Sequence, residues 1–355
     1  MLLFGSLSSF GQAFRKNKTF TRLFKIDHNT ELTVKNKYGN IQLITWNKDS
    51  VKFEIKIEVR DNKEAKAISK IDAIDIDFIS SKHYIEAKTY FAGENAFWSE
   101  VKDKTGNIFS SENKIQVNYV VYLPIEMGLT IENKYGDVLM DDHLGTTSIT
   151  LLNGDLKAHA LKGETILNLE FAYANIKQMN NARLNLGYHS ELQLTKAKKL
   201  KIESRSSRIR IEAADKIDIK SYRDKCHIED VGILNAQNSY TYLEIQRISK
   251  FASIDATYGD IDIRKIENEV SKITFNTENT DISIIQPINR AIEFNLVYNE
   301  KAGLYFPEEL QNKTTTKKSD EDLLVETTGV LGVETSNPLQ VKATLISGNI
   351  RVSSN

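Results

Sequence analysis

Two stretches that lie far apart in the chain carry nearly the same eight residues. Residues 36–43 read NKYGNIQL and residues 133–140 read NKYGDVLM. In each stretch the Tyr-Gly pair predicts a tight turn, and the alternating aliphatic residues after it predict a strand with one buried face. A turn and strand that return almost unchanged constrain the chain to a fold of repeated β units.

Weaker copies of this unit follow the second one. We call the residue in the place of Asn40 the anchor of a copy, and anchors recur about every 18 residues. The residue after the anchor is aliphatic in nearly every copy, which predicts a buried column. The later anchors are Asp137, Asp155, Asn175, Glu191, Arg208, Cys226, Tyr242, Asp260 and Asp281.

A fixed period with aligned apolar columns is typical of a solenoid, in which each repeat buries its apolar face only against its neighbours. The turns carry Gly, Asn and Asp, and the flanks alternate with period two, so the unit is built from strands. We therefore expect an all-β chain folded as a right-handed parallel β-solenoid, or β-helix, with about 18 residues per coil. Evenly spaced short strands also fit the alternative of an antiparallel β-sandwich.

The regions before the regular repeats have different patterns. Residues 1–13 (MLLFGSLSSFGQA) are apolar and then small, as in a partial signal peptide, although a frayed apolar end of a cytosolic protein is the other interpretation. Residues 14–130 predict an N-terminal β region that begins with a polar lead-in. Within it, apolar residues at helical spacing predict an amphipathic helix at about 62–73, and residues 91–114 predict a long loop.

Regular β-solenoid repeats are expected over residues 131–285. After them the rhythm breaks, and residues 286–355 predict a flanking β element, a polar loop at 311–322 and a terminal capping repeat. The last copy of the motif, SGNIRV at 347–352, is expected to cap the open edge of the sheet.

Composition excludes several classes of protein. The 47 Lys and Arg residues nearly balance 48 Asp and Glu residues, and no basic run suggests binding to nucleic acid. No apolar run approaches the ~20 residues that span a bilayer, so no transmembrane segment is expected in the mature chain. A single cysteine excludes an internal disulfide and a cysteine-rich metal site.

The repeat around Cys226 has polar residues where other copies are apolar. His227 and Glu229 next to a thiol suggest acid–base or nucleophilic chemistry. A one-residue slip of the register places Ile228 inside instead, and adjacent residues of a strand point to opposite faces. We therefore predict no catalytic residue and no cofactor.

Carboxylates gather at two further places. Residues 141–143 (Asp-Asp-His) and the pair Asp260 and Asp262 suggest a cation site, because residues i and i+2 of a strand share a face. Neither group has the ligand count of a dedicated site, so they are interpreted as solvated turn residues and no metal is predicted.

Aromatic residues are the remaining candidates for contact with a ligand. Tyrosines at the turns, with Tyr173, predict a stacked ladder along one edge, which would hold sugar rings if exposed and would be structural if buried. Trp98, in the predicted long loop, is a further candidate for contact with sugar. The predicted ligand-contact residues are Trp46, Trp98, Tyr38, Tyr135, Tyr240 and Tyr258.

The motifs NKYGNIQLITW, NKYGDVLM and SGNIRV, with the helix after the first long strand, resemble the putative-adhesin β-solenoid family, a domain of unknown function also called head GIN or auto-transporter adhesin-like. The resemblance covers residues 29–352. It implies a parallel β-helical fold and export to the envelope or cell surface. It implies no catalytic residues.

Together these observations favour a non-enzymatic, exported, adhesin-like or envelope-associated scaffold, located in the periplasm, the cell envelope or outside the cell. Its partner would be a surface glycan or an envelope protein. The alternative is a β-helical carbohydrate-active enzyme of the polysaccharide lyase type. That enzyme would need several carboxylates and a basic residue gathered in one groove.

Overall fold

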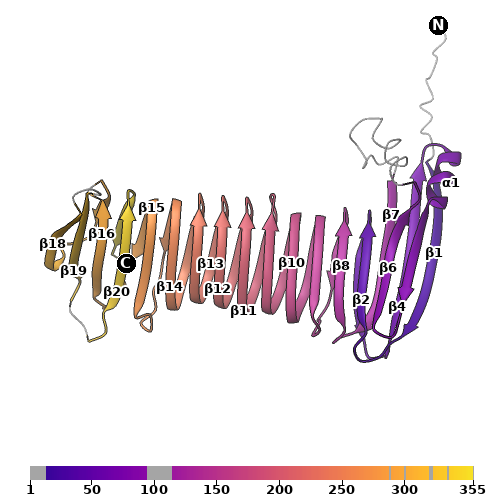
Figure 1. The fold of residues 1–355 in the computed structure, drawn as a ribbon, viewed down its shortest axis with the longest axis horizontal. Helices are drawn as coiled ribbons and strands as arrows, with labels where there is room; N and C mark the ends of the chain where they lie inside the picture. Colours follow the sequence, from indigo (N-terminus) through magenta and orange to yellow (C-terminus); the bar gives the residue numbers. More distant parts are fainter. Residues whose placement is uncertain are drawn as a thin grey trace, which may run out of the picture. The chain divides into compact units, whose positions relative to one another are not determined.

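The computed structural model describes residues 13–93, 114–287, 289–299, 301–319, 323–333 and 336–354. These residues form 21 strands and one helix, so the prediction of an all-β chain is confirmed (Figure 1). The chain divides into two compact units, which we call unit 1 (Met1–Asp141) and unit 2 (Asp142–Asn355).

Unit 1 contains the helix and the first nine strands of the described residues. They are β1 Phe14–Lys25, β2 Glu31–Lys37, β3 Ile41–Trp46, β4 Ser50–Asp61, α1 Glu64–Asp72, β5 Ile74–Ser80, β6 Tyr84–Phe91, β7 Lys114–Pro124, β8 Gly128–Lys134 and β9 Val138–Met140.

The two best copies of the motif lie side by side in unit 1. Strand β2 pairs in parallel with β8, and β3 pairs in parallel with β9, so that Asn36 is opposite Asn133 and Ile41 is opposite Val138. On their other side β2 and β3 pair in parallel with β6 and β7. The sequence repeat is therefore a repeat in space, with Ile41 and Val138 both fully buried.

Helix α1 lies inside the range predicted for it. It buries Ala67 and Ile71. Asp61, at the end of β4, accepts the backbone N–H of Lys63, just before the helix, at 3.0 Å and Nζ of Lys70, in the last turn, at 2.6 Å. The predicted partial signal peptide, up to residue 12, and most of the predicted loop, residues 94–113, lie outside the described residues.

The interpretation of residues 14–24 as a polar lead-in is wrong. They belong to β1, which pairs antiparallel with β4 along its whole length, from Phe14 opposite Asp61 to Lys25 opposite Ser50. Most of β1 is solvent-exposed, so its sequence carries little of the apolar alternation that marks a strand.

Unit 2 contains the remaining twelve strands of the described residues. They are β10 Thr147–Gly187, β11 Glu191–Arg205, β12 Arg208–Tyr222, β13 Lys225–Ser239, β14 Tyr242–Ile263, β15 Lys272–Ile285, β16 Ile292–Asn299, β17 Gly303–Tyr305, β18 Gln311–Ser319, β19 Leu324–Leu331, β20 Leu339–Ile346 and β21 Asn349–Ser353.

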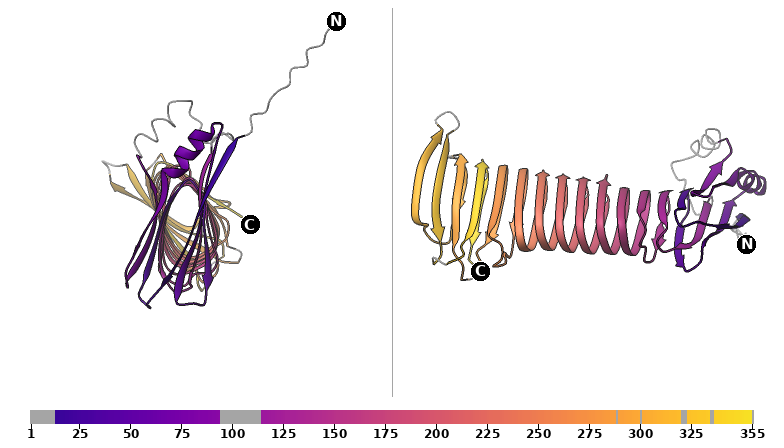
Figure 2. Two further views of the ribbon diagram at one scale, coloured as in Figure 1. Left: turned by 90° about the vertical axis from the view of Figure 1, so that its right-hand side faces the viewer. Right: turned by 60° about the horizontal axis from the view of Figure 1, so that its bottom comes forward.

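Strands β10 to β15 each pair in parallel with the next, and they lie side by side in two views (Figures 1 and 2). The step from β14 to β15 is longer than the others, with Ala252 opposite Ile273. Tyr173 is opposite Glu191, Glu191 is opposite Arg208, Arg208 is opposite Lys225, and Lys225 is opposite Tyr242. These steps of 17 or 18 residues are the period read from the sequence. Parallel pairing excludes the antiparallel sandwich for these strands.

The residue after each anchor is buried, as the apolar column predicts. Leu192, Ile209 and Leu243 are at most 1% exposed, and Cys226 stands in the same column at 1%. Two anchors assigned from the sequence are therefore wrong. Lys225 takes the place assigned to Cys226, and Tyr173 takes the place assigned to Asn175, because the column needs an apolar residue next and Ala174 supplies it.

The residue two before each anchor has a left-handed backbone conformation, and we call it the corner residue. Positive φ at a non-glycine residue is uncommon and costs about 1–2 kcal/mol, yet it recurs here at every turn. The corner residues, with φ between 48° and 65°, are Tyr38, Tyr135, Asn153, Phe171, His189, Ser206, Arg223, Tyr240, Tyr258, Asn279 and Ser347.

The glycine after a corner residue serves close packing. A Cβ on Gly136 would lie 2.1 Å from the carbonyl oxygen of Gly39, and a Cβ on Gly259 would lie 2.3 Å from that of Thr241. Neighbouring repeats approach one another here through their backbones. The left-handed conformation belongs to the tyrosine, whereas the glycine makes room.

The end of unit 2 differs from the prediction. Strand β21, the expected terminal cap, pairs in parallel with β15 on one side and β17 on the other. Strand β20 lies likewise between β15 and β16 (Figure 1). The edge is formed instead by the antiparallel strands β19 and β18. Residues 311–319 are thus strand β18 and not the loop predicted at 311–322, and the Thr-rich run 314–316 suits an edge strand.

We predict that Ile209→Asp destabilises unit 2 by more than about 3 kcal/mol, because it buries an unpaired carboxylate in the core. Arg208→Asp is the matched control. Arg208 is exposed, and the change replaces its surface ion pair with Glu191 at 3.0 Å by two neighbouring carboxylates, an exposed electrostatic effect of about 1 kcal/mol. Similar urea or thermal unfolding curves for the two variants would contradict the register.

We also predict that Gly259→Ala destabilises by about 1–3 kcal/mol, because the new methyl group meets backbone that cannot move cheaply. In Gly187→Ala the nearest atom is the Cγ of Glu170 at 3.8 Å, so that variant should change stability by less than about 1 kcal/mol. Melting temperatures of the two variants test this, and equal losses would show that repeats do not approach through their backbones.

Candidate functional site

A strip of aromatic and cationic side chains runs along the corners of unit 2. We call Arg205, Tyr222, Arg223, Tyr240 and Tyr258 the corner strip. Tyr240 and Tyr258 are stacked with ring centroids 5.0 Å apart and planes 8° from parallel, and they are 51% and 45% exposed. Arg223, Tyr240 and Tyr258 are corner residues, and Arg205 and Tyr222 directly precede corner residues.

Tyr222 is held at the centre of the strip. The guanidinium of Arg205 lies 5.2 Å and that of Arg223 lies 5.0 Å from its ring centroid, and Arg223 also lies 5.7 Å from the ring of Tyr240. Each such cation–π contact contributes about 0.5–1 kcal/mol at an exposed site. The contacts fix long side chains that would otherwise be free.

The stacking limits what the tyrosines can bind. Tyr240 and Tyr258 turn one face each toward the other, so those faces are closed to a sugar ring. The ring edges, the hydroxyls and the faces turned away from the stack are what Tyr240 and Tyr258 offer to a ligand. The ladder of Tyr240 and Tyr258 is exposed, which is the condition under which it would hold sugar rings, and contact with a ligand at these two residues stays a prediction.

The other predicted ligand-contact residues do not share the exposure of Tyr240 and Tyr258. Tyr38 and Tyr135 are stacked at 5.2 Å, but Tyr38 is only 7% exposed. Trp46 is half-buried, and its Nε1 donates to the Ser50 carbonyl oxygen at 2.8 Å. Trp98 lies outside the described residues. Tyr173 is an anchor rather than a corner residue, so it does not belong to the ladder.

A groove of about 650 Å³ lies beside the corner strip and crosses the strands. One wall is a column of residues paired in register, and the facing wall is a second column two residues further along each strand. The first wall comprises Glu203, Lys220, Gln237, Asp255 and Asn276. The second wall comprises Tyr222, Ser239, Thr257, Glu278 and Ile346.

The groove floor consists of the residues between the two walls. Successive residues of a strand point to opposite faces, so these residues are buried while their neighbours are exposed. They are Ser204, Ser221, Asn238, Ala256 and Thr277. Tyr222 belongs to both the groove and the corner strip, which makes the two features one continuous surface.

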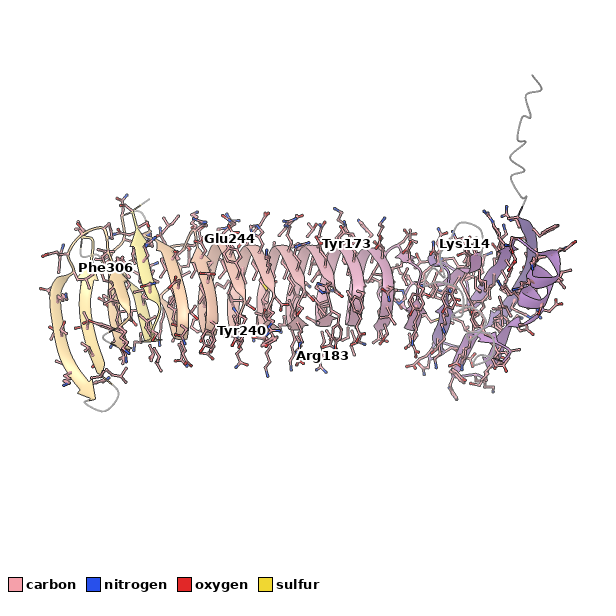
Figure 3. The ribbon with its side chains drawn as sticks, turned by 90° about the horizontal axis from the view of Figure 1, so that it is seen from above. Lys114, Tyr173, Arg183, Tyr240, Glu244 and Phe306 are labelled. Carbon is pink, nitrogen blue, oxygen red and sulfur yellow. The ribbon has the colours of Figure 1, made fainter. Side chains whose placement is uncertain are left out.

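A column of charged residues lies on the other side of the corner. His227 Nδ1 is 3.1 Å from Glu244 Oε2, and the Arg264 guanidinium is 2.5 Å from Asp262 and 4.0 Å from Glu244. Burial raises the pKa of Asp262, against the opposite effect of Arg264. Figure 3 labels Glu244 and Tyr240 on opposite long sides of the unit, so this column is separate from the corner strip.

The residues around Cys226 do not form a dyad. Cys226 is 1% exposed and faces the core, whereas His227 and Glu229 face outward. Burial, followed by the charge of Asp224, raises the pKa of the Cys226 thiol to about 12. A thiol that stays protonated inside a core is a packing residue. The alternative register considered in the sequence analysis places Ile228 inside, and Ile228 is indeed fully buried.

Asp224 is a buried carboxylate that the sequence did not single out. It is 3% exposed, and it accepts hydrogen bonds from the Ser207 backbone N–H at 2.7 Å and from Ser221 Oγ at 2.7 Å. Burial raises its pKa, although these hydrogen bonds act in the opposite direction. It holds the corner at Arg223 and is closed to a ligand.

The carboxylates of the two candidate cation sites are paired with basic residues in the structure. Asp262 pairs with Arg264, and Asp142 pairs with His159. His143 is 1% exposed and belongs to the interior of unit 2. Across the described ranges no three His, Cys, Asp or Glu residues come together in a way that would hold a metal ion.

Sequence reasoning missed Tyr222, Arg205 and Arg223. With Cys226 taken as an anchor, the corner fell on Asp224 and hid Arg223. Counting cysteine as an apolar residue would have aligned Cys226 and Ile228 with Leu243 and Ile245, because a free cysteine behaves as a small hydrophobe.

No family model matches the sequence, and no curated protein matches it. Solved structures that match include a "putative cell adhesion protein" from Clostridium sporogenes (9% identity, TM-score 0.20, 96% of this chain and 100% of that chain). A "putative adhesin" from Bacteroides fragilis matches at 10% identity with a TM-score of 0.31, over 95% and 97% of the chains. A "putative lipid binding protein" from Parabacteroides distasonis matches at 13% and 0.31, over 75% and 93%.

These TM-scores do not establish a shared fold, so the function is argued from the chain's own residues. Within the described part of the chain, none of the helical structure has the length and apolar character that crossing a membrane requires.

We predict that the single thiol is unreactive in the folded chain. Because Cys226 is buried and its pKa is raised, a disulfide reagent such as Ellman's reagent at pH 8 should not label it within the time that labels a free thiol. After unfolding in urea the same sample should release one equivalent of chromophore, which is the internal control. Fast labelling of the native chain would contradict the core position.

Proposed function

We propose that the chain is an exported, non-enzymatic, adhesin-like binding scaffold of the cell envelope, and that unit 2 is a right-handed parallel β-solenoid. The right-handed winding follows from the strong preference for that hand in parallel β connections. The partner is a surface glycan or an envelope protein. The compartment is the periplasm, the envelope or the cell exterior.

The observation that carries this proposal is the continuous surface made by the corner strip and the groove. It repeats the same positions on successive strands, from Glu203 on β11 to Asn276 on β15. Each of these strands is paired on both sides, so the surface is rigid. A rigid, repetitive surface suits an extended partner, because little conformational entropy is lost when it binds.

The non-enzymatic part of the proposal rests on the geometry of the reactive side chains. The only cysteine is buried and protonated. Of the carboxylates on the groove walls, Glu203 lies on β11, three strands away from Asp255 on β14, and only Asp255 and Glu278 lie on adjacent strands, on facing walls. General acid–base catalysis needs two groups within reach of the same bond.

A polysaccharide-cleaving enzyme is the second candidate, and the charged column favours it. There Glu229, Glu244 and Asp262 lie close to His227 and Arg264. This is the combination of carboxylates and basic residues that such an enzyme requires. None of these residues lines the groove described above.

The proposal is tested by a binding screen of the purified chain against a glycan array and against solubilised envelope fractions, with release of reducing ends measured in parallel. We expect binding without turnover. The Cys226→Ser, His227→Ala double variant should bind as well as the natural chain.

Turnover that disappears in Glu244→Gln would instead identify the charged column as an active centre, and the scaffold proposal would then fall. Loss of turnover in the Cys226→Ser, His227→Ala variant would have the same consequence. Arg210→Gln, an exposed change in the same column of the neighbouring strand β12, is the control for a mutation that only alters the surface.

A further inference from the structure

The groove of unit 2 has a length and direction that select an extended polymer. Its walls run across β11, β12, β13, β14, β15 and β20, perpendicular to the strands. With adjacent strands about 4.8 Å apart, it extends over roughly 20–25 Å. The position of the first wall recurs on β11 to β15 and carries a polar side chain on each strand, although its identity changes from strand to strand, so a partner with a repeating unit meets a hydrogen-bonding group at each step.

The lining selects neither a polyanion nor a peptide. Carboxylates at Glu203, Asp255 and Glu278 are balanced by the ammonium group of Lys220 and the guanidinium groups of Arg205 and Arg223 beside Tyr222, so the groove has no excess of positive charge that would attract a polyanion. A peptide helix would need an apolar groove, and here only Ala256, Ile346 and the ring of Tyr222 are apolar. A peptide strand would need a free sheet edge, and β11 to β15 have both edges paired.

The remaining side chains are hydrogen-bonding groups of both kinds. Gln237 and Asn276 offer a donor and an acceptor each, Ser239 and Thr257 offer hydroxyls, and Asp255 accepts. Such mixed groups along a shallow polar track complement a chain of hydroxyl groups, each of which also donates and accepts.

We propose that this groove binds an extended, uncharged oligosaccharide along the stacking direction of the strands. Gln237, Asp255 and Asn276 bind its hydroxyls from one wall, and Ser239 and Thr257 bind them from the other. Tyr222, fixed between two guanidinium groups, closes the groove at the side of the corner strip. This inference rests on the proposed scaffold function and assigns its ligand class and its site.

The test uses isothermal titration calorimetry of the full chain with neutral hexasaccharides of β-linked glucose, of β-linked mannose and of N-acetylglucosamine. At least one should bind, and its trisaccharide should bind about tenfold or more weakly, because a shorter chain contacts fewer strands. A heparin-derived hexasaccharide, which is strongly anionic, should not bind.

The Gln237→Ala, Asn276→Ala variant should weaken the binding about tenfold or more, since it removes hydrogen-bonding groups from exposed positions. The matched control is Lys225→Ala, Ser283→Ala, which changes exposed residues of the same two strands after the corner and should leave affinity unchanged. Circular dichroism melting curves verify that both variants fold.

Equal affinity of the groove variant and the natural chain would overturn the assignment of the site. Binding of none of the neutral hexasaccharides would overturn the ligand class. If the chain then still captured an envelope component without turnover, the scaffold function would stand and only this inference would fail. Turnover of a hexasaccharide would defeat the scaffold function itself.

Discussion

The structure depends on one local constraint, which is the left-handed corner residue at each turn of the repeats. Each corner costs about 1–2 kcal/mol because a side chain crowds its own backbone. Each is followed by two residues of the buried column, such as Ile209 and Ile211, and burying an aliphatic side chain contributes about 1.5–3 kcal/mol. The column therefore outweighs the strain, and in-register stacking fixes the same conformation at every turn.

The same constraint determines what the surface displays. At the left-handed corners of the strip the side chains of Tyr240 and Tyr258 are exposed, and the residue after Tyr258, Gly259, packs against backbone of the neighbouring repeat. Aromatic corner residues recover part of the strain by stacking, which contributes about 0.5–1.5 kcal/mol for a pair such as Tyr240 and Tyr258. Stacked aromatic residues at the corners thus contribute to stability, so their presence there is not by itself a sign of ligand binding.

The repeat period, the buried columns and helix α1 followed from the sequence, because each has a local pattern of apolar residues. The register predicted from the sequence is wrong at two repeats. Cys226 was assigned as an anchor although it stands in the aliphatic column, and Asn175 was assigned as an anchor although it lies two residues past the true one. Strands β1 and β18 have largely exposed side chains, so they lack the alternation by which a strand is recognised. The groove was not predictable, since its walls are columns across repeats and no single repeat contains it.

The order of strands at the end of unit 2 could not be read from the sequence, because it depends on pairing between distant segments. Strand β15 pairs with β20, 68 residues further along the chain, from Lys272 opposite Gln340 onward. Until β20 and β21 are in place, one edge of β15 is unpaired, and such an edge invites association with other chains. The pairing of β20 with β15 also adds Ile346 to the second wall of the groove, so the groove is complete only after β20 has paired. Strand β18, which is paired only with β19, carries Lys313, Lys317 and Lys318, and lysines on an edge strand oppose the addition of another chain.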